Sequence, residues 1–170
     1  MNDRDVIAVV AKALEVLSAS GSKAIDYSSV GGDSANRGVL SVCDIEAARA
    51  VREAVISLPT EQHLAVMWRV TKDNPRLGEG YLLDLTCFVS HYVSKSERFG
   101  RDGLVYWVRH WARHDGSCRE AASLFGGSYV THHRFYQEKV QICLDGWFIA
   151  AKGALEPVIE KHYERYCEAA

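Results

Sequence analysis

Apolar side chains recur every three or four residues along most of this chain, and that helical period constrains its fold more than any other feature. Alternation of apolar and polar residues, which is typical of half-buried strands, does not occur in the sequence. Proline interrupts helices, and only Pro59, Pro75 and Pro157 are present. Because 48% of the 170 residues are hydrophobic, the chain can bury a core, and we predict an all-α protein.

Helix-capping and helix-breaking residues divide the sequence into segments. The spacing predicts a first helix over Arg4–Leu17, followed by an irregular arm over Ser18–Ser41 that is rich in glycine and serine. Further helices are expected to begin at Asp44, Pro59, Tyr81, Asp102, Ser117 and Ser128. We therefore divide the chain into an N-terminal helix and arm, residues 1–43, and a helical domain, residues 44–170.

Cysteine usage and the first residues limit the class of protein. The five cysteines lie far apart, and no two of them form a Cys-x-x-Cys pair. We therefore expect reduced thiols rather than a disulfide framework or a zinc ribbon, and no metal or cofactor. No apolar run reaches the length that crosses a bilayer, and the charged start lacks the apolar core of a secretory signal. These features predict a cytoplasmic protein with no membrane partner.

The net charge of -2 conceals an uneven distribution along the chain. Residues 1–62 carry 6 basic and 9 acidic side chains, whereas residues 63–140 carry 11 basic and 8 acidic ones. Residues 141–170 carry 3 basic and 5 acidic side chains. A positive centre between acidic ends favours contact with a polyanion through one face of the molecule.

The strongest local signals lie in the last third of the chain. Ser117 and Glu120 form a Ser-x-x-Glu capping box, which predicts the start of a short helix. Gly126-Gly127 permits the left-handed backbone of a tight turn, and Ser128 can cap a second helix directly afterwards. Two short helices joined by such a turn are typical of a helix-turn-helix, which we place at residues 117–140.

In a helix-turn-helix the start of the second helix enters the major groove of DNA. Hydroxyl, imidazole, guanidinium and amide groups in this segment can meet phosphates and base edges. We therefore predict as DNA contacts Arg119, Ser128, Tyr129, Thr131, His132, His133, Arg134 and Gln137. Of the two adjacent histidines, one is expected to face the core and the other to face outward. The alternative interpretation is a plain helical hairpin with polar outer faces.

A metal site and an enzyme are competing interpretations of the residues just before this segment. His110, His114 and Cys118 are four residues apart, but the intervening glycine interrupts the helix that would align them. Cys118 could pair with His114 and Asp115 as nucleophile and base, but no glycine-rich oxyanion loop accompanies them. The sequence also lacks a phosphate loop of the Walker type. We therefore expect no enzymatic activity.

The helix before the capping box is aromatic, and we expect its Trp107 and Trp111 to be core residues rather than a platform for base stacking. This long amphipathic helix, its glycine stop and the following Ser-x-x-Glu helix together resemble region 4 of sigma factors. The Leu58-Pro59 step upstream is similar to a leucine-proline step in that region.

The order of the parts resembles the small class of phage Q-type late-gene antitermination proteins, including their prophage-derived relatives. The similarity covers Asp26–Ala150. Its elements are Asp26-Tyr27-Ser28-Ser29-Val30, Cys43-Asp44, His114-Asp115-Gly116-Ser117, the helix-turn-helix, and an extended helix over Tyr136–Trp147.

The resemblance implies a nucleoid-associated factor that binds a promoter-proximal DNA element, in one or two copies, and loads on a paused bacterial RNA polymerase that still holds sigma factor. It would then block hairpins of the nascent RNA at the exit channel and so activate downstream genes. A collar around RNA needs a positive lining. The expected contacts to RNA or polymerase are Arg69, Lys72, Arg76, Lys95, Arg98 and Arg101. The alternatives are a helix-turn-helix regulator acting at initiation and, for these basic residues, a solvated charged face.

Overall fold

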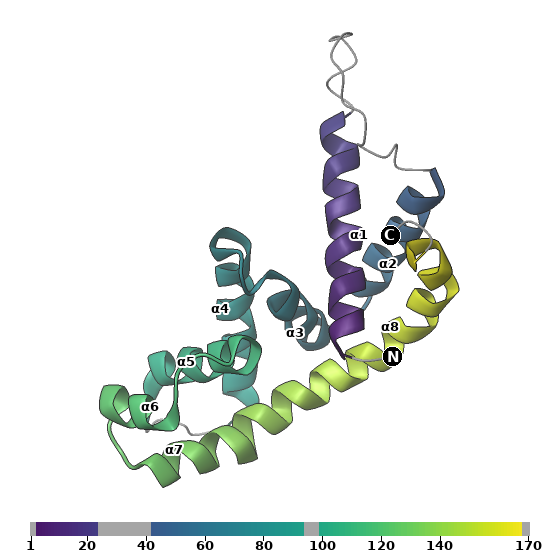
Figure 1. The fold of residues 1–170 in the computed structure, drawn as a ribbon. Coiled ribbons are helices and arrows are strands. Elements are labelled where there is room, and N and C mark those ends of the chain that lie inside the picture. Colours follow the sequence, from purple (N-terminus) through teal and green to yellow (C-terminus); the bar gives the residue numbers. More distant parts are fainter. Residues whose placement is uncertain (1–2, 24–41, 94–98, 168–170) are drawn as a thin grey trace. The chain divides into compact units, whose positions relative to one another are not determined.

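The structure is a computed structural model that describes residues 3–23, 42–93 and 99–167 of the chain (Figure 1). Helices account for almost all of these residues, and no strand occurs among them. The predicted all-α class is therefore confirmed. Within the same three ranges, no helix is both long enough and apolar enough to cross a bilayer.

Contacts within the chain define two compact units, residues 1–58 with 152–170, and residues 59–151. The first unit contains α1 (Asp3–Lys23), α2 (Val42–Ile56) and the C-terminal part of α8 (Ile142–Cys167). This division differs from the boundary at residue 43 drawn from the capping and helix-breaking residues, because α1 and α2 pack on each other.

α1 is longer than the helix predicted from the sequence, and the first residues of the arm expected over Ser18–Ser41 are helical. The Ser18 hydroxyl donates a hydrogen bond to the Leu14 carbonyl at 2.9 Å. Serine often favours loops, but here its hydroxyl is hydrogen-bonded within α1, so the helix continues past Ser18. The rest of the expected arm, including Asp26–Val30, lies outside the described residues.

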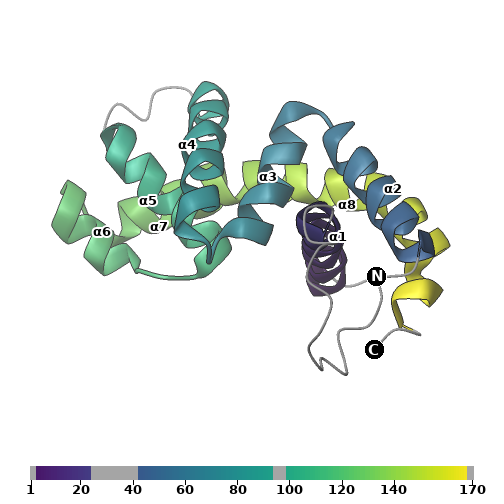
Figure 2. The same ribbon diagram turned by 90° about the horizontal axis from the view of Figure 1, so that it is seen from above.

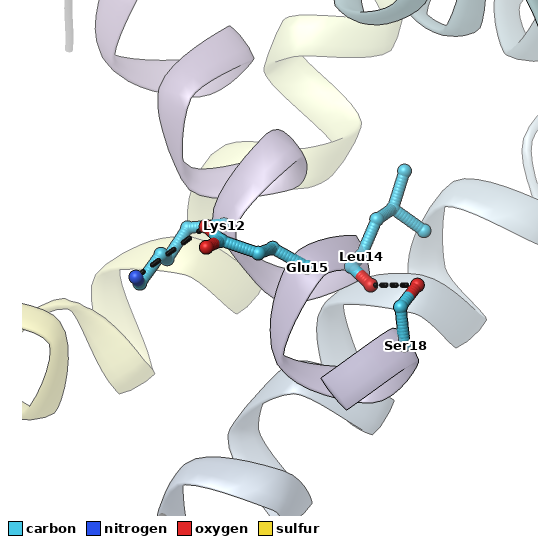
Figure 3. Close-up of polar contacts among 4 residues, drawn as sticks. All are labelled: Lys12, Leu14, Glu15 and Ser18. Carbon is cyan, nitrogen blue, oxygen red and sulfur yellow. Dashed lines mark hydrogen bonds and ion pairs between the residues drawn. The ribbon is translucent and has the colours of Figure 1, made fainter. Parts of the chain in front are cut away.

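The core of the first unit is aliphatic. Its buried side chains are Val6, Val9, Val10, Ala13 and Val16 on α1, Ala47, Ala48, Val51 and Val55 on α2, and Leu155 and Ile159 on α8. They follow the three- and four-residue spacing of an amphipathic helix. Lys12 and Glu15 of α1 are both exposed, and Lys12 Nζ lies 3.4 Å from Glu15 Oε2; Figure 3 shows this ion pair and the Ser18 hydrogen bond.

The second unit holds α3 (Thr60–Thr71), α4 (Pro75–Tyr92), α5 (Gly100–Arg113), α6 (Cys118–Phe125), α7 (Tyr129–Phe135) and the start of α8. The π-helix η1 (Tyr136–Gln141) joins α7 to α8, so the chain stays helical from Tyr129 to Cys167 (Figure 1). α3, α4 and α5 pack on one another, and α6 packs on α7 (Figure 2).

α4 begins earlier than the helix predicted at Tyr81. Pro75 occupies its first turn, where the N–H that proline lacks would have no helical partner. Asn74 Oδ1 accepts hydrogen bonds from the backbone N–H groups of Arg76 and Leu77 at 3.1 and 3.3 Å. An asparagine cap followed by proline thus starts the helix, and the apolar spacing alone did not reveal this signal.

Aromatic side chains fill the core of the second unit. Trp107 and Trp111 are buried, which confirms that they are core residues. The Trp68 indole N–H donates to the Val108 carbonyl at 3.0 Å, and the Trp111 indole N–H donates to Asp145 Oδ1 at 2.7 Å. These two hydrogen bonds tie α3 and the start of α8 to α5.

Candidate nucleic-acid interface

α6 and α7 form a pair of short helices joined by a two-glycine turn. Ser117 Oγ accepts a hydrogen bond from the Glu120 N–H, and Ser128 Oγ accepts one from the Thr131 N–H, both at 3.2 Å. The turn has φ values of 73° and 87° at Gly126 and Gly127, in the left-handed region that favours glycine. The predicted caps and turn are therefore confirmed.

Tyr106 completes the start of α6. The Ser117 N–H donates to the Tyr106 hydroxyl at 2.7 Å, and that hydroxyl lies 3.1 Å from Glu120 Oε2. In a full capping box the glutamate would accept from the serine N–H directly. Burial, together with the charge of Glu120, raises the pKa of Tyr106. A tyrosine of α5 therefore fixes where α6 begins.

His132 lies in the core and is 0% exposed. Its Nε2 lies 2.8 Å from the Gly126 carbonyl oxygen, and its ring centroid lies 4.3 Å from that of Phe99. This placement corrects the expectation that His132 contacts DNA, because its ring has no surface to offer a partner. The prediction that one of the two histidines faces the core is confirmed, and His132 is that residue.

The opposite side of α7 is exposed. Tyr129 and Val130 are 50% and 59% exposed, and the Arg134 side chain is 70% exposed. The ring of half-buried His133 stacks on the ring of Tyr129, with centroids 5.7 Å apart. Because these four residues share one side of the helix, we call Tyr129, Val130, His133 and Arg134 the α7 face. It contains three of the predicted contacts.

The remaining predicted DNA contacts differ in exposure. Arg119, Ser128 and Gln137 are exposed, whereas Thr131 is half-buried and its hydroxyl lies 2.9 Å from Ser128 Oγ. Arg134 Nε lies 3.7 Å from Glu138 Oε1, in an exposed pair that holds the guanidinium only weakly.

Sequence reasoning missed the apolar part of the exposed surface. Val130 on α7 and Leu124 on α6 are both largely exposed. The apolar spacing of helices assigns such residues to a core. The signal that could have found Val130 is its position directly after the cap and next to Tyr129, at the start of the second helix.

Two of the basic residues expected to contact RNA or polymerase are used inside the second unit. The Arg69 guanidinium lies between the rings of Trp111 and Phe148, 4.2 and 4.1 Å from their centroids, and 3.7 Å from Asp145 Oδ1. Lys72 is half-buried, and its ammonium group donates to a backbone carbonyl of α5. Both groups therefore stabilise the packing of α3 on α5 and α8, a role that the sequence did not indicate.

The other basic residues of that set differ in position. Arg76 and Arg101 are exposed at the starts of α4 and α5. Lys95 and Arg98 lie outside the described residues.

The residues just before α6 are those of the alternative metal and nucleophile interpretations. His110 Nδ1 contacts the Asp115 carbonyl oxygen at 2.5 Å. Burial raises the pKa of the Cys118 thiol, which is the opposite of what an activated nucleophile needs. Among residues 3–23, 42–93 and 99–167, no three His, Cys, Asp or Glu side chains are placed to hold a metal ion.

The geometry around α6 and α7 is therefore that of a capped helix pair with a buried anchor and an exposed, chemically mixed face. Comparison of the chain with protein-family models, with curated proteins and with solved structures gave no match.

Proposed function

We propose that this protein binds duplex DNA through α6 and α7, acting as a sigma-region-4-like helix-turn-helix, and that it is a transcription antitermination factor. The α7 face carries the DNA-binding part of this proposal. It presents aromatic, apolar, imidazole and guanidinium groups at the start of a helix whose opposite side is held in the core by His132. A recognition helix requires this division between a buried and an exposed side.

The chemistry of the α7 face suits a DNA groove. In this assignment Arg134 hydrogen-bonds a guanine edge or a phosphate, and Val130 and Tyr129 meet thymine methyl groups. Ser128, which caps α7, and Arg119, which is exposed in the first turn of α6, would contact the phosphate backbone and so set the position of the helix in the groove. The excess of basic residues in the central part of the chain supports the same partner.

The antitermination part rests on the resemblance of the sequence to the small class of Q-type proteins. In this role the protein binds a promoter-proximal element, joins a paused RNA polymerase that holds sigma factor, and prevents hairpins from forming in the nascent RNA. Of the described residues first expected to contact RNA or polymerase, Arg76 and Arg101 remain the candidates because both are exposed.

Transcription with purified bacterial RNA polymerase tests this function. The template carries a duplex element that the protein binds, a promoter, and an intrinsic terminator far downstream. We expect added protein to increase readthrough of the terminator, and we expect the Arg134→Ala variant to lose that effect. Arg52→Ala, which changes an exposed arginine of α2, is the matched control and should keep it.

A changed amount of initiation with normal termination would contradict the antitermination proposal. That outcome would assign the protein to helix-turn-helix regulators that act at initiation, and it would leave the DNA-binding assignment of the α7 face intact.

A further inference from the structure

A cavity of about 300 Å³ lies where α3, α4 and α5 meet, entirely within the second unit. Its lining consists of Trp68 from α3, Pro75, Glu79 and Leu82 from α4, and Arg109 and Arg113 from α5. We call these six residues the α4–α5 pocket. The volume is at the lower end of the range for small-molecule sites, so a ligand that fills it is small.

The helices around this pocket are held in place by their own packing. A Cβ atom on Gly78 would lie 2.6 Å from the Thr71 carbonyl oxygen and 3.0 Å from the Trp68 ring, so α4 approaches α3 closely. The hydrogen bond from the Trp68 indole to the Val108 carbonyl ties α3 to α5. The pocket is therefore formed before any ligand enters, which reduces the entropy lost on binding.

Two guanidinium groups face this pocket from α5. Arg113 Nε donates to the Lys72 carbonyl at 2.8 Å, and one terminal amino group of Arg113 donates to the same oxygen. The other terminal amino group has no hydrogen bond among the described residues. Arg109 lies one turn earlier on the same side of α5, and its exposed side chain is likewise unpaired in the described part of the chain. Together they favour an anionic group.

Glu79 brings a negative charge to the same pocket from α4. Its carboxylate forms no ion pair with either arginine, nor with any other residue that the structure describes. A ligand that meets all three charges carries an anionic group with a cationic donor beside it. A free α-amino acid has this arrangement, because its carboxylate and its ammonium group are bonded to the same carbon. A phosphate dianion would instead add charge of the same sign as Glu79.

The remaining lining selects the side chain of such a ligand. Trp68 and Leu82 are both buried, so they lie at the bottom of the pocket, whereas Glu79 and Arg109 are exposed at its mouth. An apolar base with a few polar groups is typical of sites for small molecules. It favours an aliphatic side chain over a charged one, because a charge at the bottom would be buried without a partner.

We propose that the α4–α5 pocket binds a free α-amino acid with an apolar side chain. Arg109 and Arg113 hold its carboxylate, and Glu79 accepts hydrogen bonds from its ammonium group. The side chain packs on Leu82 and Trp68. Binding needs neither DNA nor the function proposed for α7, so the two proposals stand or fall separately.

Titration of the full chain with L-leucine, followed by ¹H–¹⁵N NMR without DNA, tests this site. We expect saturable shifts that include the Trp68 indole N–H, with a dissociation constant on the order of 1 mM or below. Leucinamide lacks the carboxylate and N-acetyl-leucine lacks the ammonium group. Each should bind about tenfold or more weakly than L-leucine, because each loses charge-assisted hydrogen bonds.

Variants at the mouth of the pocket separate binding from folding. Arg109→Ala and Glu79→Gln change exposed residues, and each should raise the dissociation constant for L-leucine about tenfold. Arg52→Ala and Asp84→Asn, which change an exposed arginine of α2 and an exposed aspartate of α4, are the matched controls and should leave it unchanged. Circular dichroism checks that every variant keeps its helices.

Three results would overturn this assignment. The first is the absence of saturable shifts with L-leucine at tens of millimolar. The second is an Arg109→Ala variant that binds L-leucine like the wild type. The third is N-acetyl-leucine binding as tightly as L-leucine, which would replace the free amino acid by the C-terminus of a peptide.

Discussion

His132 Nε2 lies 2.8 Å from the carbonyl oxygen of Gly126, across the turn that joins α6 to α7. Because a carbonyl can only accept a hydrogen bond, Nε2 carries the ring proton and donates it. Nδ1 is buried with no hydrogen-bond partner among the described residues. One side chain of α7 thus anchors that helix to the preceding turn, and the direction of the α7 face depends on this anchor.

Replacing His132 should therefore destabilise the α6–α7 pair. His132→Ala leaves a cavity and an unpaired Gly126 carbonyl, and we expect a loss of about 2–4 kcal/mol in the free energy of unfolding, measured by urea titration. His132→Gln can place an amide N–H near the position of Nε2 and should lose less. His133 is the half-buried neighbour, and His133→Ala should lower the free energy of unfolding by less than about 1 kcal/mol. Equal losses for the two alanine variants would contradict the anchoring role.

Gly116 should not tolerate a side chain. Its φ of 78° lies in the left-handed region, and a Cβ there would come within 2.2 Å of the Tyr106 hydroxyl. We expect Gly116→Ala to lower the free energy of unfolding by at least about 1–2 kcal/mol. Gly80→Ala is the control, because a Cβ at this helical position of α4 meets nothing within 4 Å. The free energy of unfolding of the control should rise by about 0.5–1 kcal/mol. A Gly116→Ala variant that is as stable as Gly80→Ala would refute this account of α6.

Tyr136 should make the stability fall at alkaline pH. Burial, and to a lesser extent the charge of Asp145, raises the pKa of Tyr136 to about 12. The unfolded chain releases this proton near its ordinary pKa of about 10, so the free energy of unfolding falls as the pH rises between about 10 and 12. Tyr136→Phe keeps the ring that stacks on Trp107 and has no proton to release. Urea titrations at about pH 8 and about pH 11 should show a smaller decline for this variant, and equal declines would contradict the prediction.

The cysteines should differ in their reactivity toward a thiol reagent. Burial raises the pKa of Cys143 to about 11, so little of the reactive thiolate is present near neutral pH. Cys87 is exposed. In a Cys43→Ala, Cys167→Ala background, mass spectrometry should find Cys87 modified well before Cys143. In urea the two thiols should react at similar rates. If Cys143 reacts as fast as Cys87 in the folded protein, the burial assigned to Cys143 is contradicted.

The local signals of α6 and α7 could be predicted from sequence because each is a short-range effect. A serine cap at Ser117 or Ser128 bonds the backbone within its own first turn, and Gly126-Gly127 adopts a backbone conformation that other residues rarely take. The all-α class followed in the same way from the spacing of apolar residues. The start of α4 was missed because its signal is a cap, Asn74, that lies outside the apolar pattern.

The side-chain partners could not be predicted because they depend on tertiary packing. Arg69 is a charged residue in a basic region, and only the fold places its guanidinium between Trp111 and Phe148. His132 and His133 are chemically equivalent in the sequence, and the helix rotation decides which of them reaches the Gly126 carbonyl. Val130 was missed because an apolar side chain does not by itself indicate exposure, and only its position just after the Ser128 cap could have done so.

Binding of the protein to duplex DNA tests the central claim most directly. Selection from a random duplex library, followed by sequencing of the bound DNA, supplies a probe whose dissociation constant is then measured for the wild type, Arg134→Ala and Arg52→Ala. We predict an enriched sequence, a loss of about 1–3 kcal/mol in binding free energy for Arg134→Ala, and no loss for Arg52→Ala. No enriched duplex, or an Arg134→Ala variant that binds like the wild type, would contradict the assignment of the α7 face.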